Sequence, residues 1–413
     1  MGKEVKTTMQ SYWMVQEELQ RMYPQMVKWR RQMHRRPELS FAEEWTPRFI
    51  AETLTEMGIE VRTGVGGRGV VGRIRSANSG RTVALRADFD ALPIQDEKSV
   101  PYKSQIPGVM HACGHDAHTA TLLGVAASLQ KVRQDLPGDV VLIHQFAEEV
   151  DPGGAQPMIQ DGCLDGVDAI FGTHFWSGFP LGTIGLRAGA VMAAADSFEL
   201  EIYGKGGHGA SPHETVDALL VGCQIVTQMQ TVVSRRIDPL HSAVLSFGAF
   251  QSGNAFNVIA DQASLKGTVR TFDEAVRRRV QEEMERVLEG TCRAYGASYR
   301  FRYQKGYPAV VNHAGETQRL AEVITALFGE EALLPVEPLM AGEDFSFYLQ
   351  KVPGAFFFTG AQNPQRDAVY PHHHPKFDVD ERAMMNAANV LAAVACFYNH
   401  EEGSPSPVKL EKL

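Results

Sequence analysis

Residues 111–149, HACGHDAHTATLLGVAASLQKVRQDLPGDVVLIHQFAEE, contain the pattern that decides the fold. His118–Val132 is rich in Ala and Leu, with small residues that allow close packing, and it predicts a buried helix. Asp139–Phe146 is mainly apolar and predicts a strand that is buried on both faces. The two patterns return in a predicted helix at Ala155–Gln160 and a predicted strand at Asp168–Phe175. This alternation predicts an α/β fold with helices layered on a sheet.

A different pattern begins near residue 192. The predicted strands and helices that follow lie at 197–203, 216–233, 243–250, 262–271, 273–295 and 298–303. Polar alternation along the strands is typical of a sheet with one exposed face. A helix–strand pattern then resumes to the end of the chain. We therefore expect a discontinuous α/β catalytic domain with a mixed sheet, residues 1–191 and 307–413, interrupted by a smaller α+β domain at 192–306.

The glycine-rich segment 64–69, GVGGRG, fits the dinucleotide-binding pattern GxGxxG. That function requires a helix directly after the glycines, so that the helix N-terminus can hold a pyrophosphate. The residues that follow, Val70–Arg75, instead have the pattern of a strand. We therefore predict a hairpin turn here.

The composition sets outer limits on the function. A chain of 413 residues exceeds one ordinary compact core, and 44% hydrophobic with 22% charged residues is typical of a globular protein. Forty basic against 49 acidic residues give a net charge of -9, which argues against nucleic acid or an anionic membrane as a partner. No apolar run reaches the roughly 18 residues of a membrane span, and the N-terminus lacks a signal-peptide core, so we expect a cytoplasmic protein. Five scattered cysteines do not suggest a disulfide framework.

The strongest chemical signal is His111–His118, which contains three histidines and Cys113. Thiolate and imidazole are preferred ligands of zinc and similar metals. The segment also opens a predicted helix, where partial positive charge favours a thiolate. Two alternatives remain open: a polar loop with incidental histidines, or a nucleophilic Cys113 with a histidine base.

A pair of carboxylates, Glu148 and Glu149, follows the predicted strand Asp139–Phe146. In open α/β sheets, sites gather beyond the carboxyl ends of the strands. One carboxylate there can bind a metal while the other takes a proton from water. Most such pairs are surface charges, so the position after a buried strand is what makes this pair a candidate.

Other polar residues point to the same edge of the sheet. His174 ends the next buried strand, at the position that Glu148 occupies on what we expect to be a neighbouring strand. Asp88 and Asp90 follow the predicted strand Thr82–Arg86 and should lie at the border of the site. The tract His372–His374 near the C-terminus is of a kind that binds metals.

Taken in order, these motifs resemble the M20 family of metallopeptidases and aminoacylases. The closer resemblance is to its amidohydrolase branch, with hippurate hydrolases, bacterial aminoacylases and plant auxin-conjugate hydrolases. The resemblance covers nearly the whole chain, through residues 34–41 (HRRPELSF), the Asp88 and Cys113 motifs, 147–149 (AEE), 204–210 (GKGGHGA), 257–259 (NVI), 342–345 (GEDF) and the histidine tract.

The resemblance implies a pair of divalent ions, which Zn, Mn, Co or Ni would suit. The matching ligands are Cys113, His115, Glu149, His174 and His373, with His374 as a competitor for the last position. The resemblance also gives Glu148 the role of general base, in agreement with the interpretation of the carboxylate pair.

The inserted domain of such proteins is a lid and a dimer interface. By resemblance, His208 reaches the partner subunit's site and polarises the scissile carbonyl, while Asn257 and Arg270 lie near the substrate's carboxylate. A homodimer or a dimer of dimers is implied. The chain departs from the family at Ala260, where many relatives have proline, and at Val150–Asp151, which enlarges the loop after Glu149.

The function predicted from the sequence is metal-dependent hydrolysis of the amide bond of an N-acyl amino acid. A dipeptidase or carboxypeptidase of the same superfamily is the alternative. A catalytically silent binding protein with the same fold is a third, which the complete set of ligands and Glu148 disfavours.

Overall fold

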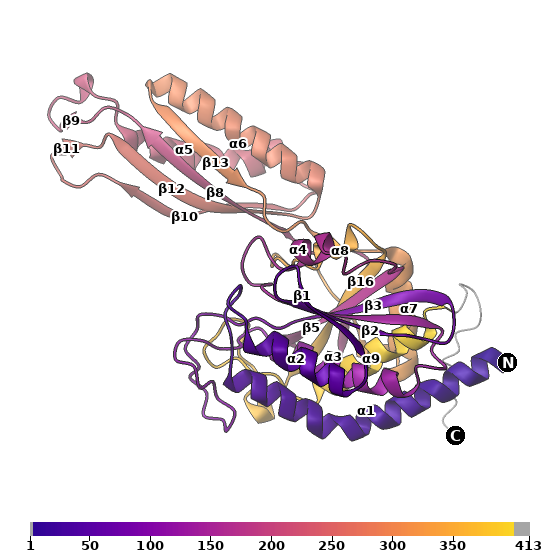
Figure 1. The fold of residues 1–413 in the computed structure, drawn as a ribbon. Coiled ribbons are helices and arrows are strands. Elements are labelled where there is room, and N and C mark those ends of the chain that lie inside the picture. The colour runs from indigo at the N-terminus through magenta and orange to yellow at the C-terminus, as the bar shows by residue number, and fades with distance from the viewer. Residues whose placement is uncertain (1–2, 400–413) are drawn as a thin grey trace. The chain divides into compact units, whose positions relative to one another are not determined.

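The computed structural model describes residues 3–399 and divides the chain into two compact units (Figure 1). The larger unit consists of Met1–Val191, Val311–Glu337 and Asp344–Leu413, and the smaller one of Met192–Val310 and Pro338–Glu343. Met1, Gly2 and residues 400–413 lie outside the description. Both units combine helices with a sheet, so the mixed α/β class predicted from the sequence is confirmed.

The larger unit is built on an eight-stranded mixed sheet in the order β1-β2-β4-β3-β5-β16-β6-β15. The inner strands β4, β3, β5 and β16 are parallel, whereas β2 is antiparallel to β4 and β6 to β16. Its strands are β1 (Glu60–Val65), β2 (Gly69–Ile74), β3 (Gly80–Asp88), β4 (Gly138–Gln145), β5 (Ala169–Pro180), β6 (Ile184–Leu186), β15 (Leu333–Pro335) and β16 (Gly354–Gln362). The glycine-rich segment 64–69 joins β1 to β2 as the predicted hairpin.

Helices α2, α3, α9 and α7 pack on this sheet, and the long helix α1 lies against α3 and α9 (Figure 1). The helices are α1 (Lys3–Arg35), α2 (Trp45–Glu56), α3 (His115–Lys131), α4 (Ala155–Gln160), α7 (Ala314–Phe328), α8 (Ser346–Leu349) and α9 (Ala383–Phe397). Small residues bring α1 and α3 close together. A Cβ atom added at Gly124 would lie 2.5 Å from the sulfur of Met26, so a larger residue there would require the Met26 side chain to move.

The strand order corrects one expectation from the sequence. We expected the strand that ends at His174 to lie beside the one that precedes Glu148, but β3 lies between β5 and β4. The three strands are parallel, so their carboxyl ends still meet at one edge. The central strand therefore places Asp88 and Asp90 at the middle of this edge rather than at its border.

The smaller unit has a four-stranded antiparallel sheet in the order β10-β12-β8-β13, with α5 and α6 packed on it. The strands are β8 (Ala194–Tyr203), β10 (Ala243–Ser252), β12 (Gln262–Thr271) and β13 (Ser298–Gln304), and the helices are α5 (Ala218–Thr231) and α6 (Glu274–Tyr295). Asp217 and Asp273 cap the two helices through their side chains. A separate ladder pairs β9 (Gly207–His208) with β11 (Val258–Ile259).

Two further short strands, β7 (Gly189–Met192) and β14 (Val310–Asn312), form their own ladder. Across residues 3–399, none of the helices is both long and apolar enough to span a membrane.

Candidate metal centre

The carboxyl edge of β3, β4 and β5 and the start of α3 bring the predicted ligands together. Cys113 lies just before α3, His115 is its first residue, and His174 lies in β5. The potential ligand atoms of these three residues lie within 4.8 Å of one another, and all three residues are buried. Cys113 Sγ is 3.3 Å from His174 Nε2.

A second group, Cys113, Glu149 and His373, shares the cysteine with the first. His373 Nε2 lies 3.4 Å from Glu149 Oε2, and its side chain is 52% exposed, so this group opens to solvent. Glu148 joins the cluster through His115, whose Nε2 is 4.0 Å from Glu148 Oε2 and 3.7 Å from Glu149 Oε1.

Of the two candidates in the histidine tract, the structure brings His373 to the cluster. The backbone of His373 has φ 63°, and its N–H donates to the carbonyl of Ala112 at 2.8 Å. His374 instead stacks on Tyr370 and accepts a hydrogen bond from the backbone N–H of Lys376 at 3.0 Å. Turning the chain at His373 thus separates the two neighbouring imidazoles.

Hydrogen bonds to the far nitrogens fix the ligand histidines in one tautomer. His115 Nδ1 donates to Asp90 Oδ1 at 3.0 Å, and His174 Nδ1 donates to the carbonyl of Phe175 at 2.8 Å. Both rings therefore direct the Nε2 edge at the cluster, which is the orientation that metal-binding histidines need.

The other two histidines of these motifs support His174 from behind. His118 Nδ1 donates to Asp88 Oδ1 at 2.5 Å, and its Nε2 accepts the backbone N–H of Phe175 at 3.0 Å. His372 Nε2 donates to the carbonyl of Phe175 at 2.9 Å. Because both side chains hold the residue next to His174, they fix the backbone that carries this imidazole.

We expected the start of α3 to favour a thiolate at Cys113, but the surroundings of this residue favour the protonated thiol. Burial raises the pKa of the Cys113 thiol well above its ordinary value, and the carboxylates of Glu149 and Glu148 raise it further. Burial by itself would lower the pKa of His115, but Asp88, Asp90 and Glu149 together raise it to about 10. The surrounding negative charge thus outweighs the partial charge of the helix.

These residues fit a divalent cation. His115 Nε2 and Glu149 Oε1 are buried and have no hydrogen-bond partner in the structure, although buried polar atoms are nearly always paired. His115 belongs to the group with Cys113 and His174, and Glu149 belongs to the group with Cys113 and His373. Thiolate, imidazole and carboxylate are the ligand types of zinc and related transition metals. The structure therefore supports binding of divalent metal ions here.

Sequence reasoning missed a buried network beneath the centre. The guanidinium of Arg86 donates to Asp88 at 2.6 Å, to Asp344 at 2.9 Å and to Gln145 at 3.0 Å. Gln145 also donates to Asp344 at 2.7 Å. Arg86 and Asp88 are two residues apart on β3, so an Arg-x-Asp pair inside an otherwise apolar strand was the available signal.

The remaining predicted residues lie in the smaller unit, where the structure separates them. His208 on β9 and Asn257 beside β11 are exposed neighbours, since the carbonyl of Asn257 accepts the N–H of Gly209 at 2.8 Å. Their ladder lies at one end of the unit (Figure 1). Arg270 lies near the other end of β12, eight residues after Gln262, a span of roughly 26 Å along an extended strand. It is half-buried and donates to Thr268 Oγ1 at 2.6 Å.

Comparison with known proteins adds an independent line of evidence. The sequence pattern described as "Peptidase family M20/M25/M40" matches residues 84–396. A Bacillus subtilis protein named "Putative amidohydrolase YhaA" is 56% identical over 385 residues, which cover 93% of this chain and 97% of that protein. An N-acyl-L-amino acid amidohydrolase of Geobacillus stearothermophilus is 48% identical over 304 residues, 73% of this chain and 82% of that protein. The crystal structure of Bacillus subtilis YXEP, described as a dinuclear metal binding peptidase, is similar with a TM-score of 0.81 at 36% identity, covering 92% of this chain and 99% of that one.

Proposed function

The chain belongs to peptidase family M20/M25/M40 and is a metal-dependent hydrolase of amide bonds, and on that premise we propose that its substrates are N-acyl amino acids. The observation that carries the proposal is the convergence of the five predicted ligands and Glu148 at one edge of the sheet. The relative from Geobacillus stearothermophilus, which is named for this substrate class, supports the same assignment.

In this proposal Cys113, His115, Glu149, His174 and His373 hold two divalent ions, for which Zn, Mn, Co and Ni are the candidates. Bound ions of this type supply Lewis acidity, which polarises a carbonyl oxygen and makes water more acidic. The two groups that share Cys113 support a pair of neighbouring positions. Asp90 and the carbonyl of Phe175 keep the two buried imidazoles in the required tautomer.

Glu148 acts as the general base. Its carboxylate lies 4.0 Å from His115 Nε2 and is buried beside the ligands, so it is placed to accept a proton from an attacking water. The same carboxyl group then returns the proton to the leaving nitrogen. Its neighbour Glu149 is tied down by its backbone N–H, which donates to Asp90 at 3.0 Å, and serves as a ligand instead.

His208 stabilises the oxyanion. Its Nδ1 accepts the backbone N–H of Ala210 at 3.0 Å, which leaves the proton of a neutral ring on Nε2, where it can be donated to a developing negative charge. Loss of one such donor costs roughly 3–4 kcal/mol of transition-state stabilisation. Asn257, on the adjoining ladder, and Arg270 bind the substrate's carboxylate, for which a guanidinium has the right geometry.

The separation of His208 and Asn257 from Arg270 within the smaller unit supports a homodimer or a dimer of dimers. An N-acyl amino acid is much shorter than the roughly 26 Å that β12 spans from Gln262, three residues after the ladder strand β11, to Arg270. A single copy of this unit therefore cannot place both on one substrate, and we assign His208 and Asn257 to the site of a second copy.

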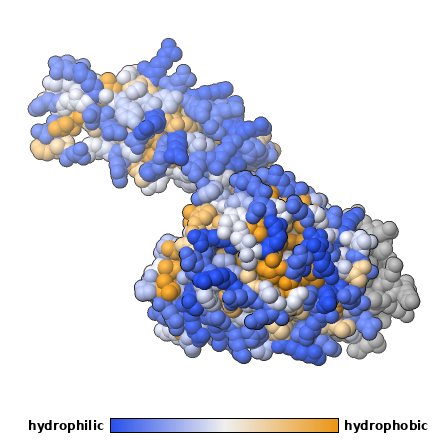
Figure 2. Space-filling model, in the orientation of Figure 1, coloured by the Kyte–Doolittle hydropathy of each residue, from blue (hydrophilic) through white to orange (hydrophobic). Residues whose placement is uncertain are grey.

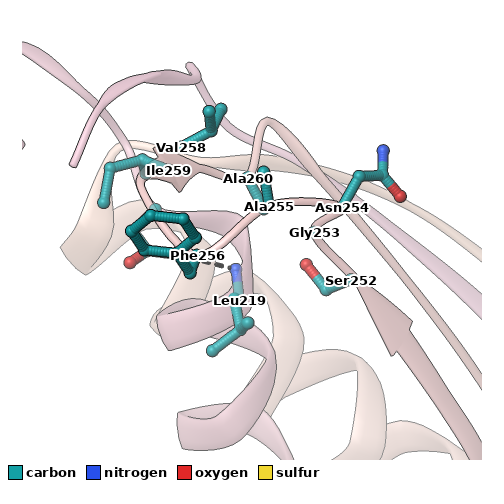
Figure 3. Close-up of a pocket in the computed structure, with 10 residues that line it drawn as sticks. Leu219, Ser252, Gly253, Asn254, Ala255, Phe256, Val258, Ile259 and Ala260 are labelled. Carbon is teal, nitrogen blue, oxygen red and sulfur yellow. Dashed lines mark hydrogen bonds between the residues drawn. The ribbon is translucent and has the colours of Figure 1, made fainter.

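The end of the smaller unit that carries the ladder has the surface that such an assembly needs. Phe256 is fully exposed there, and further exposed apolar side chains are Leu219, Leu220, Phe250 and Val258. Figure 2 shows apolar colour at this end of the smaller unit. Phe256 stands at the rim of a cavity of about 390 Å³ that is also lined by Leu219 and Val258 (Figure 3). Exposed apolar clusters of this kind mark protein interfaces.

Hydrolysis of a substrate panel tests the proposal. N-acetyl-, N-benzoyl- and indoleacetyl-amino acids and dipeptides would be offered to enzyme stripped of metal and then loaded with Zn, Mn, Co or Ni. We expect metal-dependent release of free amino acid from the acylated substrates. We also expect Glu148→Gln to abolish turnover while the variant binds as much metal as the wild type. A preference for dipeptides would favour the dipeptidase alternative, and an active Glu148→Gln would refute the assignment of the base.

A further inference from the structure

The two adjacent carboxylates, Glu148 and Glu149, approach the same ligand, which an ordinary extended chain does not allow. Successive side chains of a strand point to opposite faces. Here the carboxylates lie 4.0 Å and 3.7 Å from His115 Nε2. The residue before them, Ala147, has φ 51° in the left-handed region, two residues after the end of β4. This turn changes the direction of the chain immediately before Glu148.

A left-handed conformation is unfavourable for alanine and persists only where its surroundings impose it. Hydrogen bonds hold Ala147 on both sides. Its N–H donates to Glu43 Oε1 at 2.9 Å, and its carbonyl accepts the N–H of Gly154 at 3.1 Å. Position 154 requires glycine, because an added Cβ would lie 1.9 Å from the carbonyl oxygen of Phe146.

Glu43 has an unusual environment for a carboxylic acid. It is completely buried, and its second oxygen, Oε2, has no hydrogen-bond partner. Arg68 lies 4.0 Å from that oxygen and donates to the backbone carbonyl of Glu43, which anchors the loop. A buried carboxyl that is only half satisfied destabilises a fold, so a role in the site explains its presence better than a role in folding.

The same loop supports the other side of the centre. Three residues earlier, Ser40 donates to Asp90 Oδ2 at 2.7 Å, and that oxygen also accepts the N–H of Glu149 at 3.0 Å. The loop therefore contacts the chain on both sides of Glu148: at Ala147 directly, and at Glu149 through Asp90.

We propose that Glu43 is a positioning residue for the catalytic base: it holds Ala147 in the left-handed conformation and thereby places Glu148 at the cluster, while the hydrogen bond to Asp90 holds the ligand Glu149. The inference rests on the proposed function only for the role of Glu148.

The charge state of Glu43 suits this task. Burial, together with the nearby carboxylate of Asp90, raises the pKa of Glu43 to about 8. At neutral pH the carboxyl group is therefore mainly protonated, and it still accepts the N–H of Ala147 through one oxygen. Glutamine has the shape of a protonated glutamic acid and keeps this acceptor.

Substitutions at two positions test the proposal. Glu43→Met keeps the side-chain volume but cannot accept a hydrogen bond. We expect it to lower kcat on the order of a hundred-fold, the effect of misplacing a catalytic group by about 1 Å. KM and the metal content of the purified protein should stay within about three-fold of the wild type. Glu43→Gln should restore kcat to within about three-fold of the wild-type value. Ala147→Gly in the Glu43→Met background should recover about ten-fold, because glycine adopts positive φ without support.

Glu38 provides a matched control in the same loop. Its carboxylate accepts the backbone N–H groups of Trp45 and Thr46 at 2.9 and 2.8 Å and so caps α2 instead of holding Ala147. Glu38→Ala should lower Tm and leave kcat unchanged. Wild-type kcat in Glu43→Met would overturn the proposal, as would equal impairment of the Met and Gln variants or no recovery with Ala147→Gly. Glu148→Gln is assayed in parallel: if it is active, the assigned base is wrong, whereas if it is inactive beside a fully active Glu43→Met, only the role of Glu43 falls.

Discussion

Replacing Asp90 with asparagine should weaken metal binding far more than the loss of one charge on the surface would. The carboxylate of Asp90 accepts three hydrogen bonds: from His115 Nδ1 at 3.0 Å on one oxygen, and from Ser40 Oγ and the Glu149 N–H at 2.7 and 3.0 Å on the other. Two of the donors belong to proposed metal ligands. Asp90 and His115 are buried and Ser40 and Glu149 are partly buried, so water has little access to replace a lost acceptor.

The magnitude follows from the geometry, because asparagine offers one acceptor atom where aspartate offers two. If the amide NH₂ faces His115, the ring must shift its proton to Nε2 and lose the lone pair that would bind the metal. If the NH₂ faces Glu149, two donors oppose each other. A buried donor left unsatisfied costs about 1–3 kcal/mol, which corresponds to roughly 5- to 150-fold in affinity. Comparable substitutions behind metal-binding histidines cost about 10- to 100-fold.

Competition of the protein with a chelator of known affinity measures this effect directly, with no need for turnover. Asp139 supplies a control on β4: it is an aspartate that accepts from Arg73 at 3.0 Å and from the N–H of Ser76 at 2.9 Å, away from the cluster. Asp139→Asn should lower stability without changing metal affinity. If Asp90→Asn bound metal within two-fold of the wild type, the reasoning that Asp90 fixes the ligand tautomer would be refuted.

Three further predictions follow from the same description. Arg270→Ala should raise KM about 10- to 100-fold for acyl-amino acids and much less for uncharged amides, as steady-state kinetics would reveal; equal effects would contradict a carboxylate role. Burial lowers the pKa of His144 in the folded protein to about 3, whereas the unfolded chain titrates near 6.5. Between these two pH values only the unfolded chain binds the proton, so the free energy of unfolding falls as the pH falls. His144→Leu should therefore flatten the pH dependence of the urea midpoint below pH 6.5, and an unchanged slope would argue against it. Chelation should lower Tm and metal should restore it, because ligands bound only by the folded state stabilise it; a Tm insensitive to metal would count against the centre.

The sequence was sufficient to predict the α/β class and the residues that converge on the edge of the sheet, because both depend on local patterns. Strand periodicity, the density of histidines around Cys113 and the position of Glu148 after an apolar strand can each be recognised in a few residues. The order of the strands depends on long-range pairing. The sequence therefore did not predict that β3 lies between β4 and β5. Because the three strands are parallel, the predicted residues still lie at a common edge.

The supporting residues were harder to predict, because their roles depend on contacts between distant segments. Glu43 meets Ala147 across 104 positions of the chain, and Arg86 meets Asp344 across 258. In the sequence, Glu43 is one of two adjacent glutamates in an ordinary polar stretch, and nothing local separates it from its exposed neighbour Glu44. The pKa of Cys113 was misjudged for a related reason: the helix start is visible in the sequence, but the carboxylates that gather around the thiol come from other elements.

The protonation of the cluster explains how one arrangement can serve both the folding of the chain and the binding of metal. At neutral pH the raised pKa values of Cys113 and His115 mean that both carry protons in the metal-free protein. These protons partly offset the carboxylates of Glu148, Glu149 and the two aspartates behind them, so the chain can fold before any cation binds. A divalent ion must displace both protons to use the thiolate and the imidazole, and this makes its affinity rise with pH. The contacts from Asp90, His118 and Glu43 do not require the ion, since they are made between protein groups alone. The positions of the proposed ligands are thus set by the fold, and a bound cation would take over a charge balance that protons maintain in its absence.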